Sequence, residues 1–303
     1  MKPIRVRTIS EFHRLNELAP PAHPLISIVD YATVAARKQA APQSVLMDYY
    51  TISKKRGLNG RMRYGQQDYD FNEGVMYFMA PGQILQTTPL SKGEEKPSGW
   101  ILLIHPDFLW NTPLASSIHQ YEYFDYEVNE ALFLSEKEEV TIDGIIENIR
   151  SESHNNIDKF SQGIIISHIG TLLHYAERFY SRQFITRKKS GHQVFGKLDQ
   201  LPNDSFHGEN AAGKGLPTVK YLSEQMHMSP GYLSSLLKNL TGMSMQQHIH
   251  EKLIERAKER LSTTALAVSQ IAYELGFEHS QSFSKLFKSK TSLSPLEFRA
   301  SFN

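Results

Sequence analysis

The chain has 303 residues, of which 40% are hydrophobic and 21% charged, with no cysteine and a formal net charge of +1 at pH 7. This length allows two domains with separate cores, and the missing cysteines exclude disulfides, thiol catalysis and cysteine-ligated zinc. Apolar runs fall far short of the roughly 20 residues of a membrane span, and the first residues lack the apolar stretch of a signal peptide. The sequence therefore predicts a cytoplasmic protein with no membrane partner.

Charge is distributed unevenly along the chain. Residues 1–185 hold 18 Lys and Arg against 22 Asp and Glu, whereas residues 214–303 hold 11 against 7. This acidic–basic split indicates that the C-terminal part meets an anionic partner.

Residues 23–106 are predicted to form short strands. Turn sequences rich in Gly, Pro and Asn separate three aliphatic and aromatic stretches, which are SVLMDYYTIS (44–53), GVMYFMA (74–80) and GWILLIH (99–105). Many short strands with such punctuation favour an antiparallel sandwich or barrel.

The hydrophobic period then changes to that of helices. Ser135 followed by Glu138 is a capping-box signature at the start of one helix, and a second helix is expected over residues 157–180. The apolar positions of these helices are Val140, Ile145, Ile146, Ile149, Phe160, Ile164, Ile165, Ile169, Leu172, Leu173, Ala176 and Phe179. Either the whole stripe packs on the strands, or one edge of the helices at 136–183 faces a second copy of the chain.

A connector is expected next, because residues 186–215 lack periodicity and are rich in turn-forming residues. The sequence therefore predicts three parts: a domain over residues 1–185, a flexible linker over 186–215 and a helical domain over 216–303.

The helical domain begins with two short helices joined by a tight break. Thr218 is the expected cap of a helix that ends near Met226, and Ser229 caps the next helix with Pro230 at its first position. The buried stripe of the second helix is expected to be Leu233, Leu236, Leu237 and Leu240. Two such helices form a helix-turn-helix motif.

The same pattern occurs again 50 residues later. Leu233 corresponds to Phe283, Leu237 to Phe287 and Lys238 to Lys288. Between the copies, Ser244 caps a straight helix that runs to about residue 262. A rod of about 25 Å could hold two recognition helices about one duplex turn, roughly 34 Å, apart. The alternative is a compact helical bundle that binds protein.

The stretches SPGYLSSLLK (229–238), QIAYELGF (270–277), SFSKLFK (282–288) and SPLEFR (294–299) resemble the DNA-binding domain of the AraC/XylS family of transcription regulators. The sequence departs from the family at Ser292, where Gly is usual. The stretches at 71–83, 99–110 and 179–184 resemble more loosely the cupin-type sensor domain of such regulators. The resemblance implies an α+β chain: a cupin-like jelly-roll with trailing dimerisation helices, then two helix-turn-helix motifs joined by a long helix.

Candidate DNA contacts lie on the exposed side of each second helix. Those expected to touch bases are Ser280, Gln281, Ser284 and Lys285 in the second motif and Gly231, Tyr232, Ser234 and Ser235 in the first. Those expected near phosphates are Lys238, Lys288 and Lys290. Because Gln and Lys discriminate between bases better than small side chains, the second motif is expected to contribute at least as much specificity as the first.

An enzyme is not expected in the first domain. Its strand region between Ser44 and Leu103 contains no histidine for a cupin-type metal site, and no nucleophile-elbow, P-loop or Rossmann motif is present; neither metal nor cofactor is predicted. A small barrel can instead hold an effector, for which the candidate lining residues are Tyr49, Arg61, Arg63, Tyr64 and Tyr77.

The sequence thus predicts a homodimeric, effector-modulated transcription regulator that binds double-stranded DNA, with RNA polymerase as a further candidate partner. Two alternatives stay open: a cupin-type enzyme with an accessory helical module, and a DNA binder whose N-terminal domain only dimerises.

Overall fold

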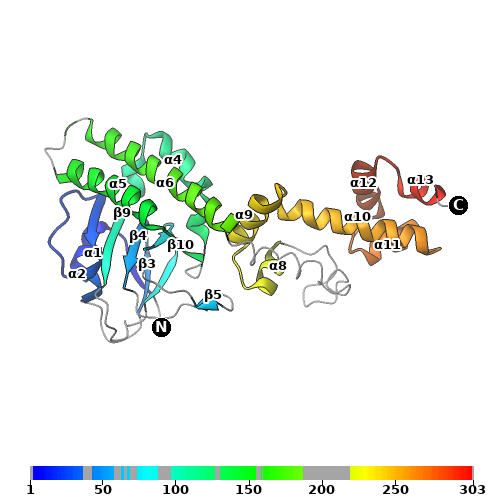
Figure 1. Ribbon diagram of the computed structural model, residues 1–303, viewed down its shortest axis with the longest axis horizontal. Helices are drawn as coiled ribbons and strands as arrows, with labels where there is room; N and C mark the ends of the chain where they lie inside the picture. Colours follow the sequence, from blue (N-terminus) through cyan, green and yellow to red (C-terminus); the bar gives the residue numbers. More distant parts are fainter. Residues whose placement is uncertain are drawn as a thin grey trace. The chain divides into compact units, whose positions relative to one another are not determined.

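The computed structural model describes residues 3–36, 43–57, 63–64, 67–68, 74–87, 97–126, 130–154, 158, 160–186 and 219–301 (Figure 1). The chain divides into two compact units, Met1–Gln183 and Phe184–Asn303. Arg61, Thr218 and the whole expected linker over 186–215, except its first residue, lie outside the described residues.

The largest sheet of the N-terminal unit is antiparallel throughout. Its strands, in spatial order, are β10 (Leu132–Phe133), β7 (Val75–Met79), β4 (Tyr50–Arg56), β9 (Ser98–Ile104) and β2 (Ile26–Asp30). Strand β4 pairs with β7 on one side and with β9 on the other, so that Lys54 faces Met76 and Trp100. The predicted stretches 74–80 and 99–105 and the end of 44–53 therefore supply the centre of this sheet, whereas the start of 44–53 forms β3 (Gln43–Met47) of another sheet.

A second sheet has the order β1 (Ile4–Val6), β3 (Gln43–Met47) and β8 (Ile84–Thr87), and β5 (Arg63–Tyr64) pairs with β6 (Gln67–Asp68). Strands β1 and β3 are parallel, which departs from the all-antiparallel expectation. The segment that joins them is long enough to cross over the sheet, as parallel pairing requires. The described strands form separate sheets that do not close into a barrel, so the jelly-roll stays a prediction.

Short helices and 3₁₀ turns separate some of the strands of this unit. These are α1 (Ile9–Leu15), α2 (Tyr31–Ala36), α3 (Pro106–Leu109) and α4 (Pro113–Ser117), followed by the 3₁₀ turns η1 (Ile118–Gln120) and η2 (Glu122–Asp125). Helix α1 begins with a capping box in which Thr8 accepts from the Glu11 N–H and Glu11 accepts from the Thr8 N–H. The expectation of strands alone over 23–106 was wrong at α2.

Strand β4 separates two packed layers because its side chains alternate between faces. Between the two larger sheets lies a core that includes Tyr31 and Tyr49 with Met47, Ile101 and Leu103. The helices α5 (Glu136–His154) and α6 (Ser161–Thr186) cover the other face of the large sheet (Figure 1).

A buried charge cluster joins α5 to the sheet. The Glu139 carboxylate accepts from Lys54 Nζ at 2.9 Å, from Arg56 Nε at 2.9 Å and Nη2 at 2.6 Å, and from the Gly74 N–H at 2.8 Å. Lys54 also donates to Asp143 at 2.6 Å. A Cβ on Gly74 would lie 2.6 Å from the Glu139 carboxyl carbon, so only glycine leaves room for this carboxylate.

The apolar stripe of α5 and α6 is only partly buried. Most of its members pack inward, but Val140 is 74% exposed, Phe160 61% and Ile164 42%. These three residues therefore do not belong to the core of the unit. Among the described residues, no helix is long and apolar enough to cross a membrane.

The C-terminal unit is helical over its described part. Its helices are α8 (Val219–Met226), α9 (Pro230–Thr241), α10 (Met245–Thr263), α11 (Val268–Glu274), α12 (Ser280–Thr291) and α13 (Pro295–Ala300). Helix α10 has 19 residues, a length of about 28 Å at 1.5 Å per residue. Helices α9, α11, α12 and α13 all contact it, so α10 is the common support of the unit (Figure 1).

Both halves of this unit end their second helix in the same way. Thr241 and Thr291 each donate to the carbonyl four residues earlier, and Gly242 and Ser292 each adopt the left-handed conformation with φ of 76° and 63°. A capping box then starts the next helix, from Ser244 with Gln247 and from Ser294 with Glu297. The 50-residue repeat of the sequence is therefore also a repeat of backbone caps.

Candidate nucleic-acid interface

The second helix of each motif has one buried and one exposed face. In α12, Phe283 and Phe287 are fully buried, and their rings join those of Phe277 and Phe298 at centroid separations of 5.4 to 5.8 Å. This aromatic cluster fixes which side of α12 faces solvent.

The exposed face of α12 is polar and basic. Gln281, Lys285 and Lys288 lie at helical spacings of four and three residues, and all three are exposed, as is Lys290. Ser280 and Ser284 are half-buried. Because α12 contains three lysines and no acidic residue, its solvent face presents a positive potential that suits a phosphate backbone.

Helix α9 presents a smaller and less charged face. Gly231, Ser234 and Ser235 are half-buried and Lys238 is exposed. They correspond by the 50-residue repeat to Gln281, Ser284, Lys285 and Lys288, so the two faces occupy equivalent positions on their helices. Lys238 is the one lysine in α9.

Tyr232 departs from the prediction of a base contact. Its side chain is only 2% exposed, because it precedes Leu236 by one helical turn and lies on the buried side of α9. The corresponding residue in α12, Ser282, is exposed. Ser282 was not among the predicted contacts, although it lies next to Gln281 and outside the stripe formed by Phe283 and Phe287.

The support helix α10 brings further polar groups close to α12. Burial and the nearby Lys290 ammonium together lower the pKa of His250, so this histidine is neutral at pH 7. Arg299 donates to the carbonyls of Leu261 and Leu266 at 3.3 and 2.7 Å and thereby holds α13 against the end of α10. Lys252 pairs with Glu255 at 3.3 Å.

The repeated helices match a known family. Residues 222–301 match the model of a helix-turn-helix domain. The arabinose operon regulatory protein of Escherichia coli is 34% identical over 82 residues, which cover 27% of this chain and 28% of that protein. The C-terminal unit contains an AraC-type helix-turn-helix domain.

Other relatives also match only part of this chain. The uncharacterized transcriptional regulatory protein YesN of Bacillus subtilis is 31% identical over 137 residues, or 44% of this chain and 36% of that protein. The crystal structure of the C-terminal domain of the response regulator yesN of Fusobacterium nucleatum is 29% identical, with a TM-score of 0.31, covering 37% of this chain and 98% of that one. The chain spans only 11% to 36% of the length of the first three curated relatives.

Two of the predicted effector residues, Tyr49 and Tyr77, each lie near Tyr31 in the N-terminal unit. Tyr49 is fully buried in the core between the sheets, where Tyr31 is also buried. The Lys55 ammonium lies over the rings of Tyr31 and Tyr77, at 5.2 and 4.9 Å from their centroids. Of the other candidates, Arg63 and Tyr64 form β5, whose side chains lie outside the described residues.

The hydroxyls of Tyr31 and Tyr49 are buried without a hydrogen-bond partner among the residues that the structure describes. Burial raises the pKa of Tyr31 to about 12 and also raises that of Tyr49, helped by the charges of Glu11 and Asp48. Both phenols are therefore neutral donors at pH 7 that lack an acceptor, which is costly inside a protein.

Histidine does not build a metal centre in the described part of the chain, where no cluster of three or more metal-binding side chains occurs. His105 has a local structural role: its Nδ1 accepts from the Asp107 N–H and thereby caps the start of α3.

Proposed function

We propose that the protein is a sequence-specific DNA-binding transcription regulator. The observation that best supports this function is that the AraC-type domain holds α9 and α12 on a single supporting helix, α10. These two helices have equivalent C-terminal caps and equivalent exposed faces. One such helix fits a major groove, and a rigid pair on one support suits two successive grooves. A helical bundle that binds protein would not need the polar, basic face of α12.

Within this proposal, α12 contributes most of the base discrimination. Gln281 is exposed and long enough to make two hydrogen bonds with an adenine edge, and Lys285 can donate to guanine. Ser234 and Ser235 offer single short contacts. Lys238, Lys288 and Lys290 neutralise phosphates and add affinity that does not depend on sequence.

Selection of duplexes from a random pool by the full chain, followed by competition with random DNA, tests this assignment. Gln281→Ala is expected to lower the affinity ratio between selected and random DNA by about tenfold, since one good base contact contributes about 1–3 kcal/mol. Lys288→Gln is expected to weaken both affinities equally and to reduce the salt slope by about one.

Gln246→Ala, an exposed glutamine of α10, is the matched control. An unchanged affinity ratio in Gln281→Ala would contradict the base contact, and no duplex binding at low salt would contradict DNA binding as a whole.

We also propose that the N-terminal unit binds a small-molecule effector between its two larger sheets. The unpartnered hydroxyls of Tyr31 and Tyr49 support this, because a ligand with hydrogen-bond acceptors would satisfy both. Such a ligand acts on DNA binding only through different affinities for two arrangements of the protein. Tyr49→Phe is expected to abolish the response of DNA binding to cell-extract metabolites while leaving basal DNA binding intact.

Measurements on the purified chain can also favour either of two alternative functions. Metal in stoichiometric amount in the purified chain would favour a cupin-type enzyme. No metabolite response, together with a dimer in solution, would favour an N-terminal unit that only dimerises. In this proposal the dimer forms through the helices at 136–183, where Val140, Phe160 and Ile164 are exposed, and RNA polymerase is a further partner.

A further inference from the structure

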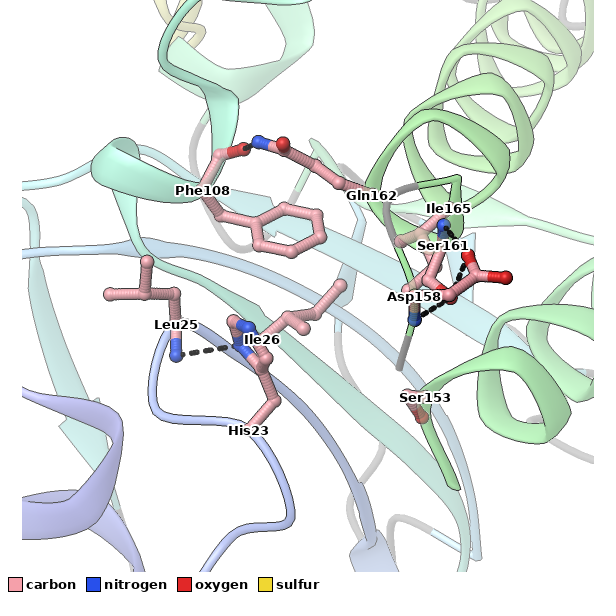
Figure 2. A pocket seen from close by; sticks show the side chains of 9 residues that line it. All are labelled: His23, Leu25, Ile26, Phe108, Ser153, Asp158, Ser161, Gln162 and Ile165. Atoms are coloured by element: carbon pink, nitrogen blue, oxygen red, sulfur yellow. Dashed lines mark hydrogen bonds between the residues drawn. The ribbon is translucent and has the colours of Figure 1, made fainter. Parts of the chain in front are cut away.

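A cavity lies in the N-terminal unit, and neither Tyr31 nor Tyr49 lines it. It has a volume of about 310 Å³ and forms where the end of α5 and the start of α6 meet β2 and α3 (Figure 2). Its lining residues are His23, Leu25, Ile26, Phe108, Ser153, Asp158, Ser161, Gln162 and Ile165. None of the five residues predicted for an effector pocket is among them.

One side of the cavity is apolar, and a ring contact and a hydrogen bond fix the position of Phe108 there. The Phe108 ring meets the His23 ring edge to face at 5.4 Å, and Gln162 reaches from α6 across to donate to the Phe108 carbonyl at 2.8 Å. Figure 2 shows the Phe108 ring facing the hollow, with Ile26 below it and Asp158 and Ser161 opposite. A flat apolar group fits against this ring.

The polar groups of the lining offer mainly lone pairs. The Ser153 hydroxyl donates to the Arg150 carbonyl at 2.9 Å, so its oxygen remains as an acceptor. Gln162 donates an amide N–H to the Phe108 carbonyl, and its side-chain oxygen remains as an acceptor. His23 accepts the Leu25 N–H at Nδ1, so its neutral ring carries a proton at Nε2 and supplies a donor. Acceptors therefore outnumber donors at the cavity.

The sign of the charge at the cavity is set by Asp158. One oxygen accepts from the N–H groups of Phe160 and Ser161, at 2.8 and 3.1 Å, so the positive end of α6 is already met by this carboxylate. The other oxygen points outward from the cavity in Figure 2 and has no partner in the described part of the chain. Burial lowers the pKa of His23, and the described lining contains neither Lys nor Arg.

We propose that this cavity binds a small organic cation, an amine with an apolar ring or chain. The apolar part lies against Phe108, Ile26 and Ile165, and the ammonium lies at the mouth of the cavity, where it meets the outward-facing oxygen of Asp158. An anion is disfavoured because the one formal charge of the described lining is negative. The inference requires neither DNA binding nor an effector between the sheets.

Three probes that share one ring and differ in charge test the proposal: benzylamine, benzyl alcohol and benzoate. Their dissociation constants for the full chain are measured by NMR titration at low salt. Benzylamine is expected to bind about fivefold more tightly than benzyl alcohol, the ratio that one partly exposed ion pair gives, and benzoate more weakly than both.

Variants assign the binding to the cavity. Asp158→Asn keeps the helix cap, because Asn caps as well as Asp, and is expected to weaken benzylamine about fivefold without affecting benzyl alcohol. Ile165→Phe narrows the cavity and is expected to weaken all three probes. Asp107→Asn, an exposed carboxylate of α3 outside the lining, is the matched control and is expected to change nothing.

Three results would each overturn the proposal. One is benzoate binding as tightly as benzylamine. Another is benzylamine binding that Asp158→Asn and Ile165→Phe both leave unchanged. The third is the absence of binding by any probe to a correctly folded wild-type chain. Because Asp158 is exposed, its Asn variant is expected to fold, so the charge test stands even if Ile165→Phe does not.

Discussion

Replacing Glu139 by Gln removes the charge at the centre of the cluster that joins α5 to the large sheet. The carboxylate accepts four hydrogen bonds from Lys54, Arg56 and the Gly74 N–H. A Gln amide has the same shape but turns an N–H₂ group toward two of these donors. Breaking a buried pair typically costs about 3–5 kcal/mol.

The lower end of that range applies to this variant. Lys54 keeps Asp143 as a partner at 2.6 Å, and the Arg56 side chain is 42% exposed, so water replaces part of what it loses. We therefore expect the free energy of unfolding of the N-terminal unit to fall by about 3 kcal/mol. At about 2–4 °C per kcal/mol for a unit of this size, Tm falls by about 6–12 °C.

The loss of stability in Glu139→Gln depends on pH and is expected to be smaller in acid. Although burial alone would raise it, hydrogen bonds from Arg56, Lys54 and the Gly74 N–H bring the pKa of Glu139 below its ordinary value of 4.5. Its stabilising contribution is therefore fully present above that value and is lost as the pH falls through the lower pKa of the folded protein. The stability difference between wild type and Glu139→Gln should shrink in acid.

Urea denaturation of the full chain, followed by circular dichroism at pH 7, 5 and 3.5, measures both quantities. Glu147→Gln on the exposed side of α5, where Glu147 pairs with Arg150 at 3.4 Å, is the control and should change stability by less than about 0.5 kcal/mol. A Glu139→Gln variant as stable as this control at pH 7 would refute the argument that the cluster holds α5 on the sheet.

Four further variants test the backbone and the core. Ser292→Gly should stabilise the C-terminal unit by about 1 kcal/mol by relieving a left-handed residue, and Gly242→Ala should destabilise it by a similar amount; equal thermal unfolding of both variants and wild type would contradict the strain. Tyr49→Phe should leave stability unchanged or raise it by up to about 1 kcal/mol in urea titrations, because the lost hydroxyl has no partner; a clear loss would show that the hydroxyl is satisfied. Gly99→Ala should prevent folding of the N-terminal unit, since its Cβ would lie 2.1 Å from the Lys54 carbonyl oxygen at a φ of 126°; a native near-ultraviolet spectrum would disprove this.

Local signals predicted the C-terminal unit well because its structure depends on short-range chemistry. Ser229 with Pro230 and Ser244 with Gln247 mark helix starts that the structure confirms. The buried stripe of α10 follows from the spacing of Ile249, Leu253, Ala257 and Leu261, all of which are buried. Tyr232 was misplaced because an aromatic residue at the edge of a stripe suits either face.

The N-terminal unit was less predictable because its architecture depends on long-range pairing. The strand stretches were found, but neither the parallel pairing of β1 with β3 nor the sheet order follows from local pattern. Helix α1 could have been found from its capping box at Thr8 and Glu11. The cavity beside α6 could not, since Leu25, Phe108 and Ile165 come from three separate stretches of sequence.

The equivalent C-terminal caps of α9 and α12 give both halves of the AraC-type domain the same backbone ending, whereas Ser229 caps the start of α9 with its side chain and His279 makes no such bond at the start of α12. Segments 229–244 and 279–294 start at matching positions, turn at matching left-handed residues and hand over to helices capped by matching serines. A chain that carried segment 279–294 in both places would keep the matching turns while exposing equivalents of Gln281 and Lys285 on both helices. The exposed face of one helix can therefore be changed without altering the turn that ends the other.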